Sequence, residues 1–204
     1  QGLGIAVVGT AAELGRIETR MKHKVSDPRK SVLFPTSASN AFSYEAGNGY
    51  TAQETLHVGM GYWLKLPIDD SPQIGGDSLL ADTIDVAEGW NMIGSLTFPL
   101  PVSSIASIPG GITTSRFFGY GNSYNVEDTI LPGSGYWVKT SQSGELILAS
   151  SGAMPDGAGR IKIVPTSEQP PSSPELTIVQ HTQAPHTCFL RQNYPNPFNP
   201  STTI

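Results

Sequence analysis

Aromatic residues close to glycine are the side chains in this sequence whose type and spacing best suit a chemical task. The flat face of a tryptophan can stack on a sugar ring, so a row of exposed rings would make a carbohydrate-binding platform. Alternatively the rings form a core, because alternate residues of a strand face opposite sides and large aromatic side chains dominate core packing. The sequence leaves both open, although the repeated spacing favours the core. The residues concerned are Tyr62, Trp63, Trp90, Tyr136 and Trp137.

Potential metal ligands are few and irregularly spaced. Zinc sites use pairs of Cys and His ligands at short intervals, and the three candidates for zinc lie in a proline-rich segment without a second pair. Calcium loops need regularly spaced oxygen ligands, and the acids flanking a glycine-rich turn lack that spacing. We therefore predict no metal site. The residues considered are His181, His186 and Cys188 for zinc, and Asp69, Asp70 and Asp77 for calcium.

Motifs for catalysis are equally weak. A Gly-x-Ser-x-Gly nucleophile sits between a strand and a helix, whereas Gly133-Ser134-Gly135 is predicted to lie in a turn between two strands. Gly2 and Gly4 are not followed by the third glycine and the acidic partner of a dinucleotide-binding fold. We predict no catalytic residue and no cofactor, and interpret this stretch of protein as non-enzymatic.

Composition narrows the class of protein. Of 204 residues only 14% are charged, and 22 Gly and 17 Pro punctuate the chain, which is typical of an all-β protein with many turns. The net charge of −5 argues against nucleic-acid binding, which favours a basic face. The single cysteine excludes an internal disulfide. No apolar run approaches the roughly 18 residues needed to cross a membrane, so we predict no transmembrane segment.

The elements that must position the aromatic residues are predicted to be short strands with tight glycine turns between them. The clearest alternation of apolar and charged residues runs from Arg16 to Val25. The one predicted helical turn is Ser103–Ser107, ended by Pro109. The predicted strands are Ile5–Val8, Arg16–Val25, Ala41–Tyr44, Thr55–Val58, Tyr62–Leu66, Thr83–Val86, Trp90–Ser95, Phe117–Tyr120, Thr129–Leu131, Tyr136–Thr140, Glu145–Ala149 and Arg160–Val164.

An internal repeat organises these strands. Asn48-Gly49-Tyr50 and the stretch Thr55 to Lys65 match Asn122-Ser123-Tyr124 and Thr129 to Lys139 at a constant offset of 74 positions. We name residues 32–80 the first copy and 83–149 the second copy. The second copy also carries a Gly-Trp-Asn-Met-Ile-Gly run, residues 89–94, for which the first copy has no counterpart near residues 15–22. The first copy is therefore expected to be incomplete or built differently.

Near its end the chain carries the block Asn193, Tyr194, Pro195, Asn196, Pro197, Phe198, Asn199 and Pro200, followed by Ser-Thr-Thr-Ile. The three prolines exclude a helix and favour an extended strip. This block resembles the opening of the C-terminal sorting domain of type IX secretion cargo in Bacteroidetes and related bacteria. The Gly-Tyr-Trp-Leu/Val-Lys repeat is similarly like one seen in exported surface proteins with such tails.

The resemblance implies an address rather than an activity. It implies a protein that is secreted or anchored on the outer-membrane surface, with the outer-membrane secretion machinery as partner of the complete sorting domain, which is an immunoglobulin-like sandwich. Only the first strand of that sandwich is expected in residues 188–204. The resemblance also implies a signal peptide, which Gln1 onward lacks, so the sequence is expected to be a fragment cut at both ends.

The predicted organisation has four parts: the end of a preceding β region (1–31), one antiparallel sandwich- or barrel-like unit built from the repeat (32–150), a strand with a Pro/Ser-rich linker (151–187), and the truncated sorting domain (188–204). The predicted function is a non-catalytic accessory region of an exported protein. Two alternatives stay open. One is a carbohydrate-binding or adhesion module for surface glycans, and the other is part of a secreted hydrolase whose catalytic domain lies upstream.

Overall fold

The computed structural model describes residues 6–8, 27–65, 78–121, 123–149, 158–161 and 167–174. These residues form an all-β fold of mainly antiparallel strands with almost no helix, as the composition predicts. The elements are β1 (Ala6–Val8), α1 (Lys30–Leu33), β2 (Ala41–Glu45), β3 (Gly49–Gln53), β4 (Gly61–Trp63), β5 (Ala81–Val86), β6 (Gly89–Ile93), β7 (Leu100–Pro101), the 3-10 turn η1 (Val102–Ser104), β8 (Ala106–Ile108), β9 (Phe117–Tyr120), β10 (Tyr124–Glu127), β11 (Thr129–Ile130), β12 (Tyr136–Thr140), β13 (Gly144–Ala149) and β14 (Gly159–Arg160).

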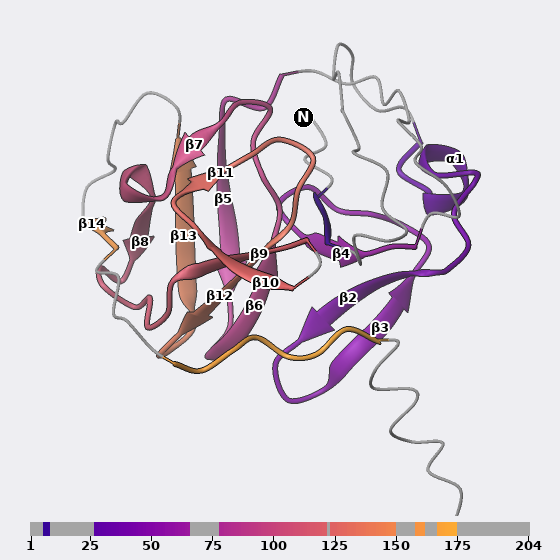
Figure 1. The fold of residues 1–204 in the computed structure, drawn as a ribbon. Coiled ribbons are helices and arrows are strands. Elements are labelled where there is room, and N and C mark those ends of the chain that lie inside the picture. The colour runs from indigo at the N-terminus through magenta and orange to yellow at the C-terminus, as the bar shows by residue number, and fades with distance from the viewer. Residues whose placement is uncertain are drawn as a thin grey trace, which may run out of the picture.

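The strands build three four-stranded sheets (Figure 1). The first sheet has the order β1-β4-β2-β3, the middle sheet β10-β9-β12-β6, and the third sheet β14-β8-β13-β5. A short ladder of β11 and β7 lies beside them. Among the described strands, every pairing is antiparallel except that of β1 with β4, which is parallel.

In the described part of the chain, two hydrophobic cores lie between the sheets, one on each face of the middle sheet. Tyr136 and Val138 of β12 lie in an aliphatic core, while Trp137 between them lies in an aromatic cluster on the opposite face. This is the alternation expected of neighbouring residues in a strand. The aliphatic core consists of Ile84, Val86, Ile93, Leu96, Leu100, Val102, Ile105, Ile112, Phe117, Ile130, Tyr136, Val138, Leu146 and Leu148.

The matched parts of the two copies hold matching positions in two sheets. β4-β2-β3 of the first copy and β12-β9-β10 of the second have the same order, and Phe42 pairs with Trp63 as Phe118 pairs with Trp137. The glycine turns before β4 and β12 also correspond, since Gly59 and Gly133 have φ of 81° and 76°, which favours glycine.

Equivalent residues of the two copies form equivalent hydrogen bonds. The His57 amide donates to the Tyr62 hydroxyl and the Leu131 amide donates to the Tyr136 hydroxyl, both at 2.8 Å. The correspondence also extends upstream of residue 32. The amide of Lys30 donates to the Glu54 carbonyl at 2.6 Å, as the amide of Val102 does to the Asp128 carbonyl at 2.9 Å.

Several sequence-based predictions need correction. The helical turn predicted at Ser103–Ser107 is wrong beyond Ser104, because Ala106–Ile108 is drawn into a strand that pairs with β13. Thr55–Val58 is not a strand, and only Thr55 forms an isolated bridge. The prediction missed the α1 turn and four strands. Two of these, β3 and β10, have few buried residues and hence no apolar alternation to find.

Other predictions fall outside the described residues. These are the strand at Arg16–Val25, the candidate metal ligands Asp69, Asp70, Asp77, His181, His186 and Cys188, and the tail block Asn193 to Pro200. Within the described part of the chain, neither helical element has the length and apolar character that a membrane crossing requires.

Candidate functional site

The aromatic cluster between the first and middle sheets is the most distinctive site of the molecule. Its buried members lie on β4 of the first sheet and on β6, β9 and β12 of the middle sheet, and half-buried aromatic residues pack against them. The buried members are Trp63, Trp90, Met92, Phe118 and Trp137, and those packed around them are Phe42, Tyr44, Tyr50, Tyr120 and Tyr124.

Aromatic rings of each copy contact aromatic rings of the other copy in two equivalent pairs. Tyr44 of the first copy meets Trp137 of the second with ring centroids 4.9 Å apart and an interplanar angle of 73°. Tyr120, which corresponds to Tyr44, meets Trp63 at 5.0 Å and 70°. Edge-to-face pairs of this kind are favourable because the positive ring edge meets the negative ring face. Each copy therefore covers the aromatic face of the other.

All five aromatic residues singled out from the sequence are buried. Trp63 and Trp90 are 4% and 8% exposed, and Trp137 is 0% exposed. Tyr62 and Tyr136 lie on the opposite side of their strands from Trp63 and Trp137. Their hydroxyls accept the amide hydrogen bonds from His57 and Leu131, and these bonds stabilise the preceding turns. A carbohydrate platform needs open ring faces, and in this structure none of the five presents one.

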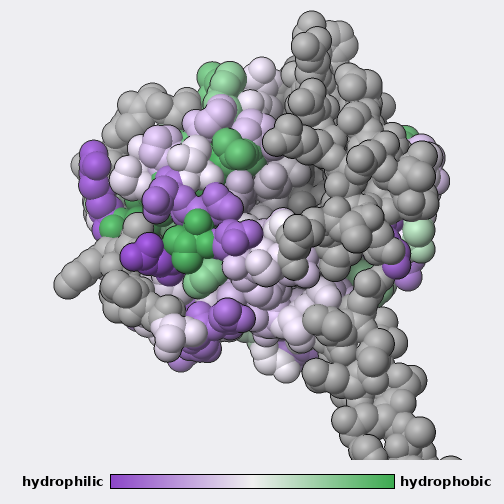
Figure 2. Space-filling model, in the orientation of Figure 1, coloured by the Kyte–Doolittle hydropathy of each residue, from purple (hydrophilic) through white to green (hydrophobic). Residues whose placement is uncertain are grey.

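Six large apolar side chains of the described residues are exposed: Val32, Met60, Leu80, Phe98, Val126 and Leu131. In the view of Figure 2, hydrophobic residues lie in separate groups between hydrophilic ones. Large exposed apolar side chains come from separate elements, such as Val32 on α1, Val126 on β10 and Leu131 after β11. Single exposed apolar residues of this kind are normal for soluble proteins.

A segment from beyond the second copy lies along the rim of the aromatic cluster. Residues 167–174, which we name the strap, run across the lower edge of the molecule in Figure 1. Tyr50 donates its hydroxyl hydrogen bond to the Ser172 carbonyl at 2.6 Å, and Tyr124 donates to the neighbouring Pro171 carbonyl. Tyr50 and Tyr124 are equivalent residues of the two copies, so each copy holds one carbonyl of the strap.

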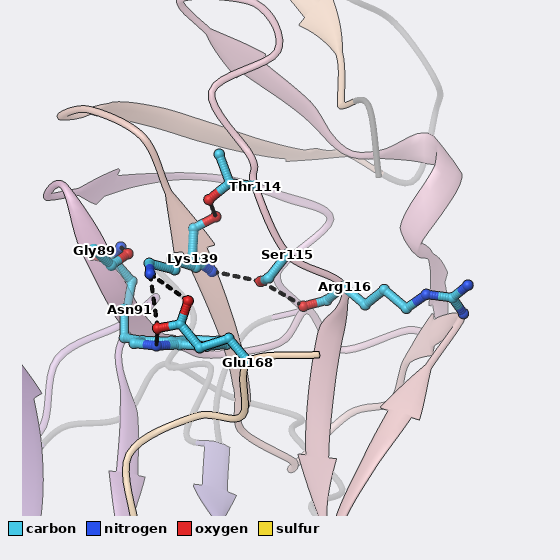
Figure 3. Close-up of polar contacts among 8 residues, drawn as sticks. Gly89, Asn91, Thr114, Ser115, Arg116, Lys139 and Glu168 are labelled. Atoms are coloured by element: carbon cyan, nitrogen blue, oxygen red, sulfur yellow. Dashed lines mark hydrogen bonds and ion pairs between the residues drawn. The ribbon is translucent and has the colours of Figure 1, made fainter. Parts of the chain in front are cut away.

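The strap is also held by a charged group. The Glu168 carboxylate accepts from Lys139 Nζ at 2.7 and 2.8 Å (Figure 3). It also accepts from Trp90 Nε1 at 3.3 Å. A hydrogen bond holds the backbone of Lys139 in place, since its amide donates to Ser115 Oγ at 2.8 Å. The hydrogen bonds from Lys139 and Trp90 lower the pKa of Glu168.

Burial disfavours the charged form of the two strap-binding tyrosines. Desolvation strongly raises the pKa of Tyr50 and of Tyr124, so both hydroxyls stay protonated and can donate. The Trp63 and Trp137 indole N–H groups lie near these hydroxyls and oppose the rise slightly. Within the described residues, neither indole N–H makes a hydrogen bond of normal geometry.

Other potential sites show less organisation. Among the described residues, no group of three or more His, Cys, Asp or Glu side chains gathers as a metal would require. Burial raises the pKa of Asp82, but its carboxylate lies over the Gly59 turn rather than beside a second acid. Ser134 lies in the turn before β12, where the sequence placed it.

Reasoning from the sequence missed the strap contacts. Tyr50 and Tyr124 carried a usable signal, since they sit at the repeat offset of 74 positions. Glu168 carried none, because an isolated acid in a proline-rich stretch looks like any linker residue.

Comparisons with known proteins find no relative: no protein-family model, no curated protein and no solved structure matches this chain. Function therefore has to be inferred from the chain's own residues.

Proposed function

We propose that this chain is a non-catalytic structural region of an exported bacterial protein, with residues 193–200 acting as an address for type IX secretion. On this proposal the outer-membrane secretion machinery is the partner of the sorting domain, and the protein is secreted or anchored on the outer-membrane surface. The β-rich part is then a rigid spacer that separates the address from whatever the parent protein delivers.

One observation carries the spacer assignment: Trp63, Trp90 and Trp137 are all buried between the sheets. Buried rings stabilise the packing of the two copies and present no face to a soluble ligand. A binding module of the stacking type would need at least two of them exposed on one side. The burial thus favours a structural role over carbohydrate binding.

The spacer assignment is tested by comparing Trp63→Ala with the unaltered chain in thermal unfolding and in binding to an array of bacterial surface glycans. We expect the variant to unfold at a markedly lower temperature, and neither protein to bind a glycan. If the variant kept its thermal stability but lost glycan binding that the unaltered chain possesses, the module would be a carbohydrate binder.

The address is tested separately in a bacterium that has the type IX machinery. The parent protein is expressed with Asn193–Pro200 intact or replaced by a Gly/Ser segment of equal length. We expect the intact protein on the cell surface or in the medium and the altered protein inside the cell. Equal distribution of the two proteins would rule out the address while leaving the spacer assignment standing.

A further inference from the structure

The rim where the two copies meet has the features of a recognition site for an extended peptide. Its polar groups come from both copies, with Tyr50 on β3, Tyr124 on β10 and Lys139 on β12. They reach two adjacent carbonyls and one carboxylate of the strap. Such a site is complete only when both copies are folded against each other.

The strap has the backbone chemistry that such donors require. Pro170 and Pro171 fix their own φ angles, bias the preceding residue toward extended conformations, and carry no N–H group. In an extended proline-rich segment the carbonyls have no internal partners, so they are free to accept from outside. Two tyrosine hydroxyls that are held protonated are suitable donors for such carbonyls.

The side chains of the strap differ in their burial. Pro170 and Pro174 are buried, whereas Ser167, Gln169 and Ser172 are exposed. Pro170, Pro174 and Ser173, which is 4% exposed, therefore face the rim, while the other polar side chains of the strap face solvent. Proline-rich segments suit aromatic-lined grooves because they are already ordered before binding and lose little conformational entropy.

Glu168 gives the segment a direction. Its carboxylate meets Lys139 and Trp90, and the Lys139 ammonium also lies 6.0 Å from the centre of the Trp90 ring. This charged contact lies at the end of the strap that precedes the prolines, so a peptide bound in the reverse direction would lose it.

We propose that this rim is a binding site for an extended proline-rich peptide with an acidic residue two positions before a Pro-Pro pair, and that its ligand in this chain is the strap, bound in cis. The strap is a ligand in the sense that its contacts depend on its own short sequence, and the same sequence on a separate peptide binds the emptied rim. By bridging equivalent tyrosines, the bound strap clamps the two copies together and fixes where the chain leaves the β-rich unit.

The test uses the full chain and a fluorescent peptide with the sequence of residues 167–174. The strap is displaced in the chain by the substitutions Glu168→Ala, Pro170→Gly and Pro171→Gly, and fluorescence anisotropy measures peptide binding. We expect the displaced-strap chain to bind the peptide at least tenfold more tightly than the unaltered chain, because a tethered ligand competes at a high effective concentration. A peptide with both prolines replaced by alanine should bind at least tenfold more weakly.

The groove side is tested by adding Tyr50→Phe and Tyr124→Phe to the displaced-strap chain. Loss of two hydrogen bonds should weaken peptide binding by roughly tenfold or more. Tyr44→Phe and Tyr120→Phe are the matched control, since these rings belong to the same cluster but their hydroxyls do not bond to the strap carbonyls. The control pair should leave peptide affinity within about twofold.

A second measurement uses the chain with its strap intact, so its result does not depend on the folding of the displaced-strap variants. On this proposal, a glutamate-specific protease cleaves after Glu168 faster when the strap leaves the rim. Tyr50→Phe with Tyr124→Phe should speed this cleavage at least tenfold, with an unchanged circular dichroism spectrum. Unchanged cleavage, equal binding of the proline-free peptide, or no peptide binding to the displaced-strap chain would each overturn the proposal. A concentration-dependent dimer that dissociates when peptide is added would overturn the assignment to the same chain.

Discussion

The two copies share one half of their structure and differ in the other half. In both, two strands form a hairpin and a third strand pairs with the first strand of that hairpin. This arrangement places a phenylalanine opposite a tryptophan, and a tyrosine of the first strand opposite a tyrosine of the second. The fourth strand of each sheet differs, and in the first sheet this strand, β1, lies outside the first copy. β6 lies antiparallel to β12 over five residue pairs, whereas β1 lies parallel to β4 over three.

The fourth strands can differ because the two faces of the middle sheet pack against different partners. The aromatic faces pack against each other, so a change in one copy has to suit the other, and the reciprocal pairs Tyr44–Trp137 and Tyr120–Trp63 preserve both. The opposite face of the middle sheet packs on the third sheet through the aliphatic core, a contact for which the first copy shows no matching sequence. A repeated sequence therefore specifies the shared interface, while the flanking strands are free to diverge.

The largest expected effect comes from breaking the shared interface in each copy. Among the described residues, Trp137 contacts three rings, at 4.9, 6.4 and 6.4 Å, whereas Trp63 contacts one ring, at 5.0 Å. Removing a buried tryptophan costs about 3–5 kcal/mol, and each aromatic pair adds about 0.5–1.5 kcal/mol. We expect Trp137→Ala to lower the free energy of unfolding by about 1–2 kcal/mol more than Trp63→Ala in denaturant titrations. Equal losses would mean that the two copies carry the interface equally.

The next effect concerns the seam where β4 approaches the middle sheet. Gly94 donates its amide to the Gly59 carbonyl at 2.8 Å, and a Cβ on Gly61 would lie 2.7 Å from Met92 Cγ and 2.9 Å from the Ile93 carbonyl oxygen. Gly61→Ala should therefore force the sheets apart and lower the free energy of unfolding by about 1–3 kcal/mol.

A matched control for this seam is Gly121→Ala. There a new Cβ would meet only Asn125 Nδ2, at the ordinary contact distance of 3.8 Å. The substitution should change stability by no more than about 0.5 kcal/mol. If the two alanine variants unfolded alike, the close approach at Gly61 would not hold the copies together.

The contrast between interface and flanks also explains what the sequence could predict. The repeat offset and the glycine turns are local patterns, and they placed β9 and β12 on their actual residues and identified Trp63 and Trp137 as candidate core. The strand Ala106–Ile108 depends on pairing with β13, far along the chain, so local signals suggested a helix instead. The strap was predicted as linker because its docking depends on tyrosines more than 40 residues away, with no periodicity of its own.

A smaller effect tests whether the two copies are equivalent at the level of single hydrogen bonds. Tyr62→Phe and Tyr136→Phe each remove an acceptor from a backbone amide at 2.8 Å, from His57 and Leu131. Each should lower the free energy of unfolding by about 1 kcal/mol. The expected equality is the informative result. A loss confined to Tyr136→Phe would show that only the second copy needs its turn to be held.

The smallest expected effect is the pH dependence of one strap contact. In this contact Glu168 meets Lys139 and Trp90 of the second copy. Hydrogen bonds from Lys139 and Trp90 lower the pKa of Glu168 below its ordinary value of 4.5. A carboxyl with a lowered pKa stabilises the folded contact above the ordinary value, and the stabilisation is lost as the pH falls through the folded value. We expect the Trp90 indole N–H resonance to shift in NMR spectra with a midpoint below pH 4.5.

The other two tryptophans provide the control within the same spectrum. Their indole N–H groups are buried away from Glu168, and only Trp90 donates to the carboxylate. Their resonances should stay in place through the transition, and Glu168→Gln should abolish the shift at Trp90. If all three signals moved together, acid would be loosening the whole aromatic cluster, and the strap carboxylate would not act as a separate contact. A shift confined to Trp90 would instead locate the acid-sensitive contact at the rim and leave the shared interface of the two copies intact.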